Sequence, residues 1–93
     1  MKLIFHTDPG HGWIECPFHL INKLGILGKI SKYSYISRDK SKVYLEEDCD
    51  ANLLVETLKN RGDTVEFEEK ISNSLSFIRN LPKFNVDNLT VIL

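Results

Sequence analysis

Two histidines and an aspartate lie close together near the start of the chain, in the segment HTDPGHGW. His6 and Asp8 fall on one face of a β-prone stretch, because alternate residues of a strand point the same way. The turn after Asp8 can bring His11 back toward that face. Two imidazoles and a carboxylate suit a divalent transition metal. The same groups suit acid–base chemistry, since histidine titrates near neutrality.

The same segment also has a structural interpretation. Pro9 fits the second position of a turn, and Gly10 fits the third position of a type II turn, where φ is positive. Asp8 would accept backbone hydrogen bonds across its own turn, and Trp13 would pack on the sheet. A further hypothesis uses the two glycine amides beside His11 as an anion-binding nest. Because HxDxxH matches no specific motif, we expect a structural turn whose neighbours, the exposed rings of His11 and Trp13, form a contact surface beside the acidic segment described next.

A second segment, YLEEDCDA, is rich in carboxylates: Glu46, Glu47, Asp48 and Asp50. These groups could bind a cation or face a basic partner. Acidic residues are also favoured at the start of a helix, where unpaired N–H groups and the helix dipole attract negative charge. We expect this structural role, with Asp48 or Asp50 as the N-cap.

A third segment, KISKYSYIS, interleaves basic and aromatic residues. Tyr33 and Tyr35 are expected on one face of a strand, a pattern typical of surfaces that stack on bases or of protein interfaces. The formal net charge of the chain is −1. Because a basic excess is absent, nucleic-acid binding is not favoured.

The elements that must position these segments alternate between strands and helices. Strands are expected at residues 2–8, 12–15, 29–37, 42–46 and 64–68. Two helices with apolar residues at i, i+3, i+4 and i+7 are also expected. One begins at Pro17 and ends before Gly25, and the other covers Ala51 to Leu58 and ends at Gly62.

This order predicts one α+β domain over residues 1–93, with a mostly antiparallel sheet of four or five strands and two helices on one face. The element order is β-(β)-α-β-β-α-β. Without the strand at 12–15, it would be that of a ferredoxin-like fold, which hosts many functions. The core is expected within about residues 1–70. Residues 71–93 are weakly patterned, and a terminal strand is expected at 89–93.

Composition favours a cytoplasmic protein. No apolar run is long enough to cross a bilayer, and the N-terminal segment does not resemble a signal peptide. Cys16 and Cys49 match no zinc-binding or CxxC spacing, so we expect two free thiols packed as small hydrophobic side chains. The sequence contains no phosphate-binding loop or dinucleotide-binding fingerprint, and no cofactor is expected.

The segments HTDPGHGW, KISKYSY and YLEEDCDA together resemble those of a group of small uncharacterised proteins encoded by bacteriophages, prophages and plasmids. The resemblance spans roughly Phe5 to Arg79. It implies a mobile-element origin, and small phage proteins of this kind often bind host proteins.

We therefore expect a small, non-catalytic binding protein that acts on a host protein or protein complex in the host cytosol, including as an inhibitor of restriction or CRISPR defence. The candidate binding residues are His6, Asp8, His11, Trp13, Tyr33, Tyr35, Glu46, Glu47, Asp48 and Asp50. One alternative is a metal- or small-ligand-binding domain, or an enzyme, centred on His6, Asp8 and His11. Another is a nucleic-acid-associated module. No membrane partner is expected, and the sequence does not indicate an oligomeric state.

Overall fold

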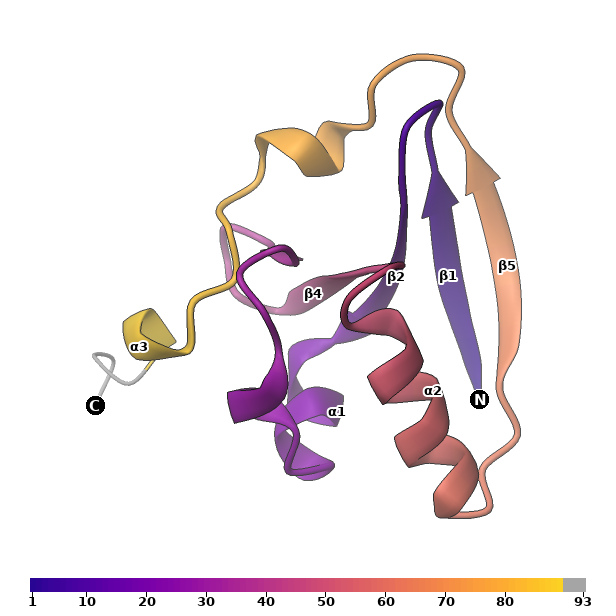
Figure 1. Cartoon of the computed structure of the whole chain (residues 1–93), viewed down its shortest axis with the longest axis vertical. Coiled ribbons are helices and arrows are strands. Elements are labelled where there is room, and N and C mark those ends of the chain that lie inside the picture. Colours follow the sequence, from indigo (N-terminus) through magenta and orange to yellow (C-terminus); the bar gives the residue numbers. More distant parts are fainter. Residues whose placement is uncertain (90–93) are drawn as a thin grey trace.

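The computed structural model describes residues 1–89. The five strands of this part of the chain form one sheet in the order β3-β4-β2-β1-β5 (Figure 1). The strands are β1 (Lys2–Thr7), β2 (Gly12–Pro17), β3 (Tyr35–Ile36), β4 (Lys42–Glu46) and β5 (Glu66–Ile71). Neighbouring strands are antiparallel except β1 and β5, which are parallel. The predicted α+β class is confirmed. Because β2 forms, the ferredoxin-like order does not apply.

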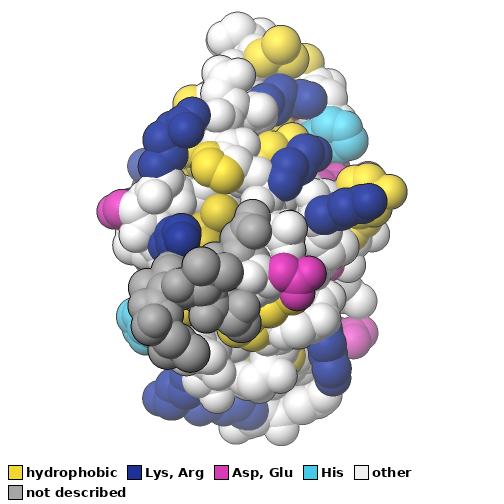
Figure 2. All heavy atoms as spheres, turned by 90° about the vertical axis from the view of Figure 1, so that its left-hand side faces the viewer, with side chains coloured by type: hydrophobic (Ala, Val, Ile, Leu, Met, Phe, Trp, Pro, Cys, Tyr) yellow, Lys and Arg dark blue, Asp and Glu magenta, His cyan; other side chains and the backbone are white. Residues whose placement is uncertain are grey.

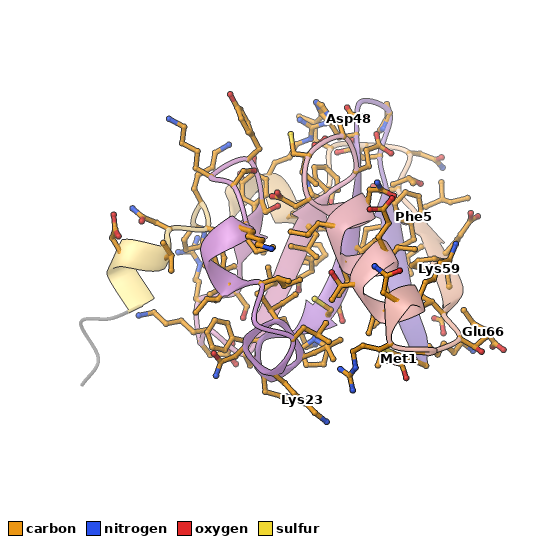
Figure 3. The ribbon with its side chains drawn as sticks, turned by 60° about the horizontal axis from the view of Figure 1, so that its bottom comes forward. Met1, Phe5, Lys23, Asp48, Lys59 and Glu66 are labelled. Atoms are coloured by element: carbon orange, nitrogen blue, oxygen red, sulfur yellow. The ribbon has the colours of Figure 1, made fainter. Side chains whose placement is uncertain are left out.

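Helices α1 (Phe18–Lys23) and α2 (Ala51–Asn60) pack against one face of this sheet (Figure 3). Their apolar side chains, including the fully buried Ile21 and Leu54, join Ile14 of β2 and Leu45 of β4 in the main hydrophobic core. Gly25 and Gly62 follow the two helices with positive φ values of 73° and 86°. These residues end the helices as predicted, since glycine adopts this conformation without a steric penalty.

The opposite face of the sheet is covered by the segment that follows β5. This segment contains two short helices, η2 (Phe77–Asn80) and α3 (Val86–Leu89), and Figure 1 shows it arching over one end of the sheet. Ile78 packs with Trp13 and Tyr44 in a second hydrophobic cluster. Phe84, which is 1% exposed, belongs to the main core.

The C-terminal segment then pairs with the outer edge of β3. Ile36 N donates to Pro82 O over 3.0 Å, and Phe84 N donates to Ser34 O over 2.8 Å. Residues beyond 70 therefore contribute to both hydrophobic clusters. Of the strand expected at 89–93, Leu89 lies in α3, and residues 90–93 lie outside the described part of the chain.

Two predicted strands differ from the structure. Only Tyr35–Ile36 of the stretch 29–37 is a strand, and a short 3₁₀ helix, η1 (Leu27–Lys29), and turns precede it. The strand expected at 64–68 covers Glu66–Ile71 instead. Phe67 of this edge strand is 43% exposed.

Pro17 also differs from its predicted role as the first residue of a helix. It is the last residue of β2 and the N-cap residue of α1. Within residues 1–89, no helix is long and apolar enough to cross a membrane.

Candidate functional site

The three segments singled out in the sequence meet at one cleft of about 260 Å³, which we call the junction cleft. HTDPGHGW contributes His11 and Trp13, KISKYSYIS contributes Tyr33 and Tyr35, and YLEEDCDA contributes Glu46, Asp48 and Cys49. Arg79 and Lys83 of the C-terminal segment complete the lining. Figure 2 views the molecule from the side of this segment, where Lys and Arg side chains spread across the upper part of the face with hydrophobic side chains between them.

The pairing of β2 with β4 sets the position of the cleft. Trp13 lies directly opposite Glu46 in this pairing, so the end of one motif meets the start of another. As predicted, His11 is next to the acidic segment, with Nδ1 lying 3.3 Å from Glu46 Oε1. The expected exposure of Trp13 is wrong. Its side chain is 1% exposed, because Ile78 and Leu81 of the C-terminal segment pack over this face of the sheet.

Asp8 holds the turn between β1 and β2 and connects it to η2. Its Oδ1 accepts from the backbone N–H groups of Gly10 and His11 over 2.9 and 3.0 Å, and its Oδ2 accepts from Ser76 N over 2.9 Å. Arg79 donates to both oxygens, from Nε over 2.6 Å and from Nη2 over 2.9 Å. This ion pair, together with the backbone donors, holds the pKa of Asp8 well below its usual range.

The structural interpretation of this turn is confirmed in its hydrogen bonds and wrong in its turn type. Positive φ values occur in the described residues at Lys40, Gly25 and Gly62, so Gly10 does not adopt the conformation of a type II turn. Instead, the Asp8 side chain closes the turn by accepting from the two residues that follow Pro9. A Cβ atom at Gly10 would lie 2.8 Å from Arg79 Nη2. Gly10 therefore makes room for the ion pair.

Asp50 ties the second and third motif segments together. It occupies the N-cap position of α2, as predicted, but its side chain forms no capping hydrogen bond. Its Oδ2 accepts from the hydroxyl groups of Ser31, over 2.7 Å, and of Ser34. Ser34 Oγ in turn accepts from Glu46 N over 3.0 Å. These side-chain bonds explain why residues 31–34 form a turn rather than the predicted strand.

The structure does not bring His6, Asp8 and His11 together, so it does not support the alternative of a metal or acid–base trio made of these residues. His6 Nε2 donates to Glu15 Oε1 over 2.9 Å. The His6 side chain lines a separate cleft together with Phe77. Asp8 is paired with Arg79, and His11 lies in the junction cleft.

Within residues 1–89, the one group of side chains that could hold a metal ion is His11, Glu46, Glu47 and Asp48. His11, Glu47 and Asp48 are exposed, whereas the side chain of Glu46 is 9% exposed. Glu46 Oε2 accepts from Asp48 N over 2.9 Å. Two buried polar atoms of residues lining the cleft, Glu46 Oε1 and Trp13 Nε1, have no hydrogen-bond partner among the described residues.

Cations and a thiol complete the chemistry of the cleft. Arg79 Cζ lies 5.4 Å from the centre of the Trp13 ring, and Lys83 Nζ lies 4.7 Å from the centre of the Tyr35 ring. Both contacts are cation–π interactions. Cys49 is exposed, and its pKa is raised by partial desolvation and by the neighbouring carboxylate of Glu46. The expectation that both cysteines are packed as hydrophobic side chains therefore fails for Cys49.

Arg79 and Lys83 are the site residues that sequence reasoning missed. Both lie in a stretch without helical or strand periodicity. Ser76 accepts from Ile78 N as the N-cap of η2, and this serine was the available local signal for an ordered turn there. The chain matches no protein-family model, no curated protein and no solved structure.

Proposed function

We propose that this chain is a non-catalytic binding protein of a phage or other mobile element, and that the junction cleft is where it contacts a host protein. The observation that carries the proposal is the convergence on this cleft of the three segments that carry the resemblance to phage, prophage and plasmid proteins. The host origin of the partner rests on that resemblance alone.

The exposed side chains around the cleft suit a protein interface. Tyr33 is 58% exposed, and the polar side chains of His11, Asp48 and Lys83 surround the same opening. An aromatic anchor within a charged rim is the usual arrangement of a binding hot spot. Because Trp13 is buried, we assign the role of aromatic anchor to Tyr33.

Site-specific crosslinking tests this proposal. Benzoylphenylalanine is incorporated in place of Tyr33 and, as the matched control, in place of Lys59, which is exposed on α2 and does not line the cleft. Each protein is irradiated in a lysate of a bacterial host, and the adducts are identified by mass spectrometry. We expect a host protein that is crosslinked from position 33 and not from position 59.

The purified partner then allows affinity to be measured. Tyr33→Ala is expected to weaken binding by about thirtyfold, the effect of losing a hot-spot residue of about 2 kcal/mol, whereas Lys59→Ala leaves the affinity unchanged. If the partner is a defence nuclease or its complex, its activity falls in proportion to occupancy. Equal crosslinking from both positions, or full affinity in Tyr33→Ala, would contradict the proposal.

A second candidate, binding of single-stranded nucleic acid, is favoured by one observation. Arg79 and Lys83 stack on the rings of Trp13 and Tyr35 in the same cleft, as cations and aromatic groups do in base-stacking surfaces. The nearby carboxylates of Glu46, Glu47 and Asp48 would repel the phosphate backbone of a nucleic acid. Fluorescence anisotropy with a labelled oligonucleotide of mixed sequence separates the two candidates. Binding at physiological salt that Lys83→Ala weakens would favour the nucleic acid.

A further inference from the structure

We propose that His11, Glu46, Glu47 and Asp48 form a binding site for one divalent transition-metal ion, with Mn²⁺ as its test ion. The inference goes beyond the proposed function, since partner binding at Tyr33 does not require it. One imidazole and three carboxylates combine a ligand that suits first-row transition metals with ligands that suit manganese. The residues differ from the trio that the sequence suggested and share only His11 with it.

The spacing of the four side chains fits a single ion. Each offers one ligand atom, and these atoms all lie within 4.8 Å of one another. Ligand atoms held about 2.1 to 2.2 Å from an ion lie about 3 Å apart when adjacent and about 4.4 Å apart when opposite. The 3.3 Å between His11 Nδ1 and Glu46 Oε1 corresponds to an adjacent pair.

Glu46 supplies an observation that is independent of this clustering. Its side chain is 9% exposed, and its Oε1 is buried without a hydrogen-bond partner among the described residues. A carboxylate this deeply buried is expected to be paired or to coordinate a metal, because desolvation of an unpaired charge is costly. Oε1 faces His11 Nδ1, and therefore points into the proposed site.

Apart from the 3.3 Å contact with His11, the basic side chains near the cleft do not pair with this group. Among residues 1–89, no Lys or Arg side chain forms an ion pair with Glu46, Glu47 or Asp48. Arg79 is bound to Asp8, and Lys83 lies over Tyr35. A dication would balance most of the charge of the three carboxylates.

Contacts with Gly12 of β2 hold Glu47 in place. Glu47 N donates to Gly12 O over 3.0 Å, and a Cβ atom at Gly12 would lie 2.7 Å from Glu47 Oε2. The missing side chain of Gly12 thus lets Glu47 lie close to β2. Figure 3 shows Asp48 at the end of the molecule beside the turn between β1 and β2.

Titration of the full chain with MnCl₂, followed by electron paramagnetic resonance of free Mn²⁺, tests the site. The protein is first dialysed against a chelator. We expect one Mn²⁺ per chain. Both His11→Ala and Asp48→Asn should raise the Kd for Mn²⁺ by at least about tenfold, because the loss of residues that only support metal ligands already lowers metal affinity by about 10–100-fold. The matched controls, His19→Ala and Glu56→Gln, change exposed side chains away from the cleft and should bind as the parent does.

Glu46→Gln should also abolish binding, and circular dichroism checks that this variant folds. If it does not fold, the two exposed ligand variants still decide the question. Failure to bind Mn²⁺, or binding that His11→Ala and Asp48→Asn leave unchanged, would overturn the site. Either result would leave the contact between His11 Nδ1 and Glu46 Oε1 as a contact without a metal ion. Crosslinking from position 33 in the presence of chelator tests the proposed function separately.

Discussion

At the scale of single residues, the two cysteines have different environments. Cys16 is 1% exposed, and burial, with a smaller contribution from the charge of Glu15, raises its pKa to about 12. Cys49 is exposed at the edge of the junction cleft. Because the thiolate is the reactive form, a raised pKa and lack of access together make Cys16 inert in the folded protein.

We therefore expect one thiol per native chain to react with Ellman's reagent at pH 8, and the second to react only after denaturation. At pH 9 Cys16 should still not react with the reagent while the protein is folded, because the pKa of its thiol is well above that value. Cys49→Ser should remove the early reaction, and Cys16→Ser should leave its rate unchanged. Two thiols that react at one rate in the native protein would show that Cys16 is accessible.

What could be predicted for single residues depended on whether their partners were local. The role of Asp8 in its own turn was predictable, because an aspartate accepts from backbone groups two and three residues ahead. Its bond with Arg79 joins residues far apart in sequence, and no local pattern encodes it. The same holds for Asp50, whose capping chemistry was expected but whose carboxylate binds Ser31 and Ser34 instead.

At the scale of elements, α2 is the part that the sequence predicted best. Its apolar spacing reflects a face on which Leu54 and Leu58 are fully buried. The segment 42–46 was also predicted with correct bounds. Segment 29–37 was not, because its alternating pattern is shared by strands and by turns whose serines bind a distant carboxylate.

Leu54→Ala and Leu58→Ala are each expected to lower the free energy of unfolding by about 2–5 kcal/mol, since each leaves a cavity in the main core. Leu53→Ala is the matched control on the same helix. Leu53 is partly buried at the border of this core, so its loss should cost less. Urea denaturation followed by circular dichroism gives all three values. Unchanged denaturation midpoints in the Leu54 and Leu58 variants would contradict the burial of this face.

At the scale of the whole molecule, the C-terminal segment completes the fold. It covers the sheet face that bears Trp13 and Tyr44 and adds backbone pairing to β3. The sequence could not predict this, because the apolar residues of the segment follow neither a helical nor a strand period. The order of the strands could not be predicted from the sequence either, because it depends on which strands pair and not on local conformational preference. The junction cleft depends on both the strand order and the C-terminal segment.

Two phenylalanines of this segment provide a matched test. Phe84 is 1% exposed in the main core, whereas Phe77 is 55% exposed. Phe84→Ala is expected to destabilise the protein by about 3–5 kcal/mol. Phe77→Ala should cost about 1 kcal/mol, for its edge contacts with His6 and Tyr44. Guanidinium denaturation monitored by the single tryptophan measures both, and equal losses would show that residue 84 is not part of the core.

The parallel pairing of β1 with β5 has a consequence for how the chain is made. β1 emerges from the ribosome before β5, yet it pairs along its length with residues 66–71, and the turn that follows it is fixed by Arg79. At about 5–20 residues per second, the first strand waits several seconds for its neighbour. During that interval the apolar side chains of β1 and β2 have no completed sheet to join. Native structure therefore forms late in synthesis, and the nascent N-terminal half is the stage at which this chain is most open to chaperones and to premature association.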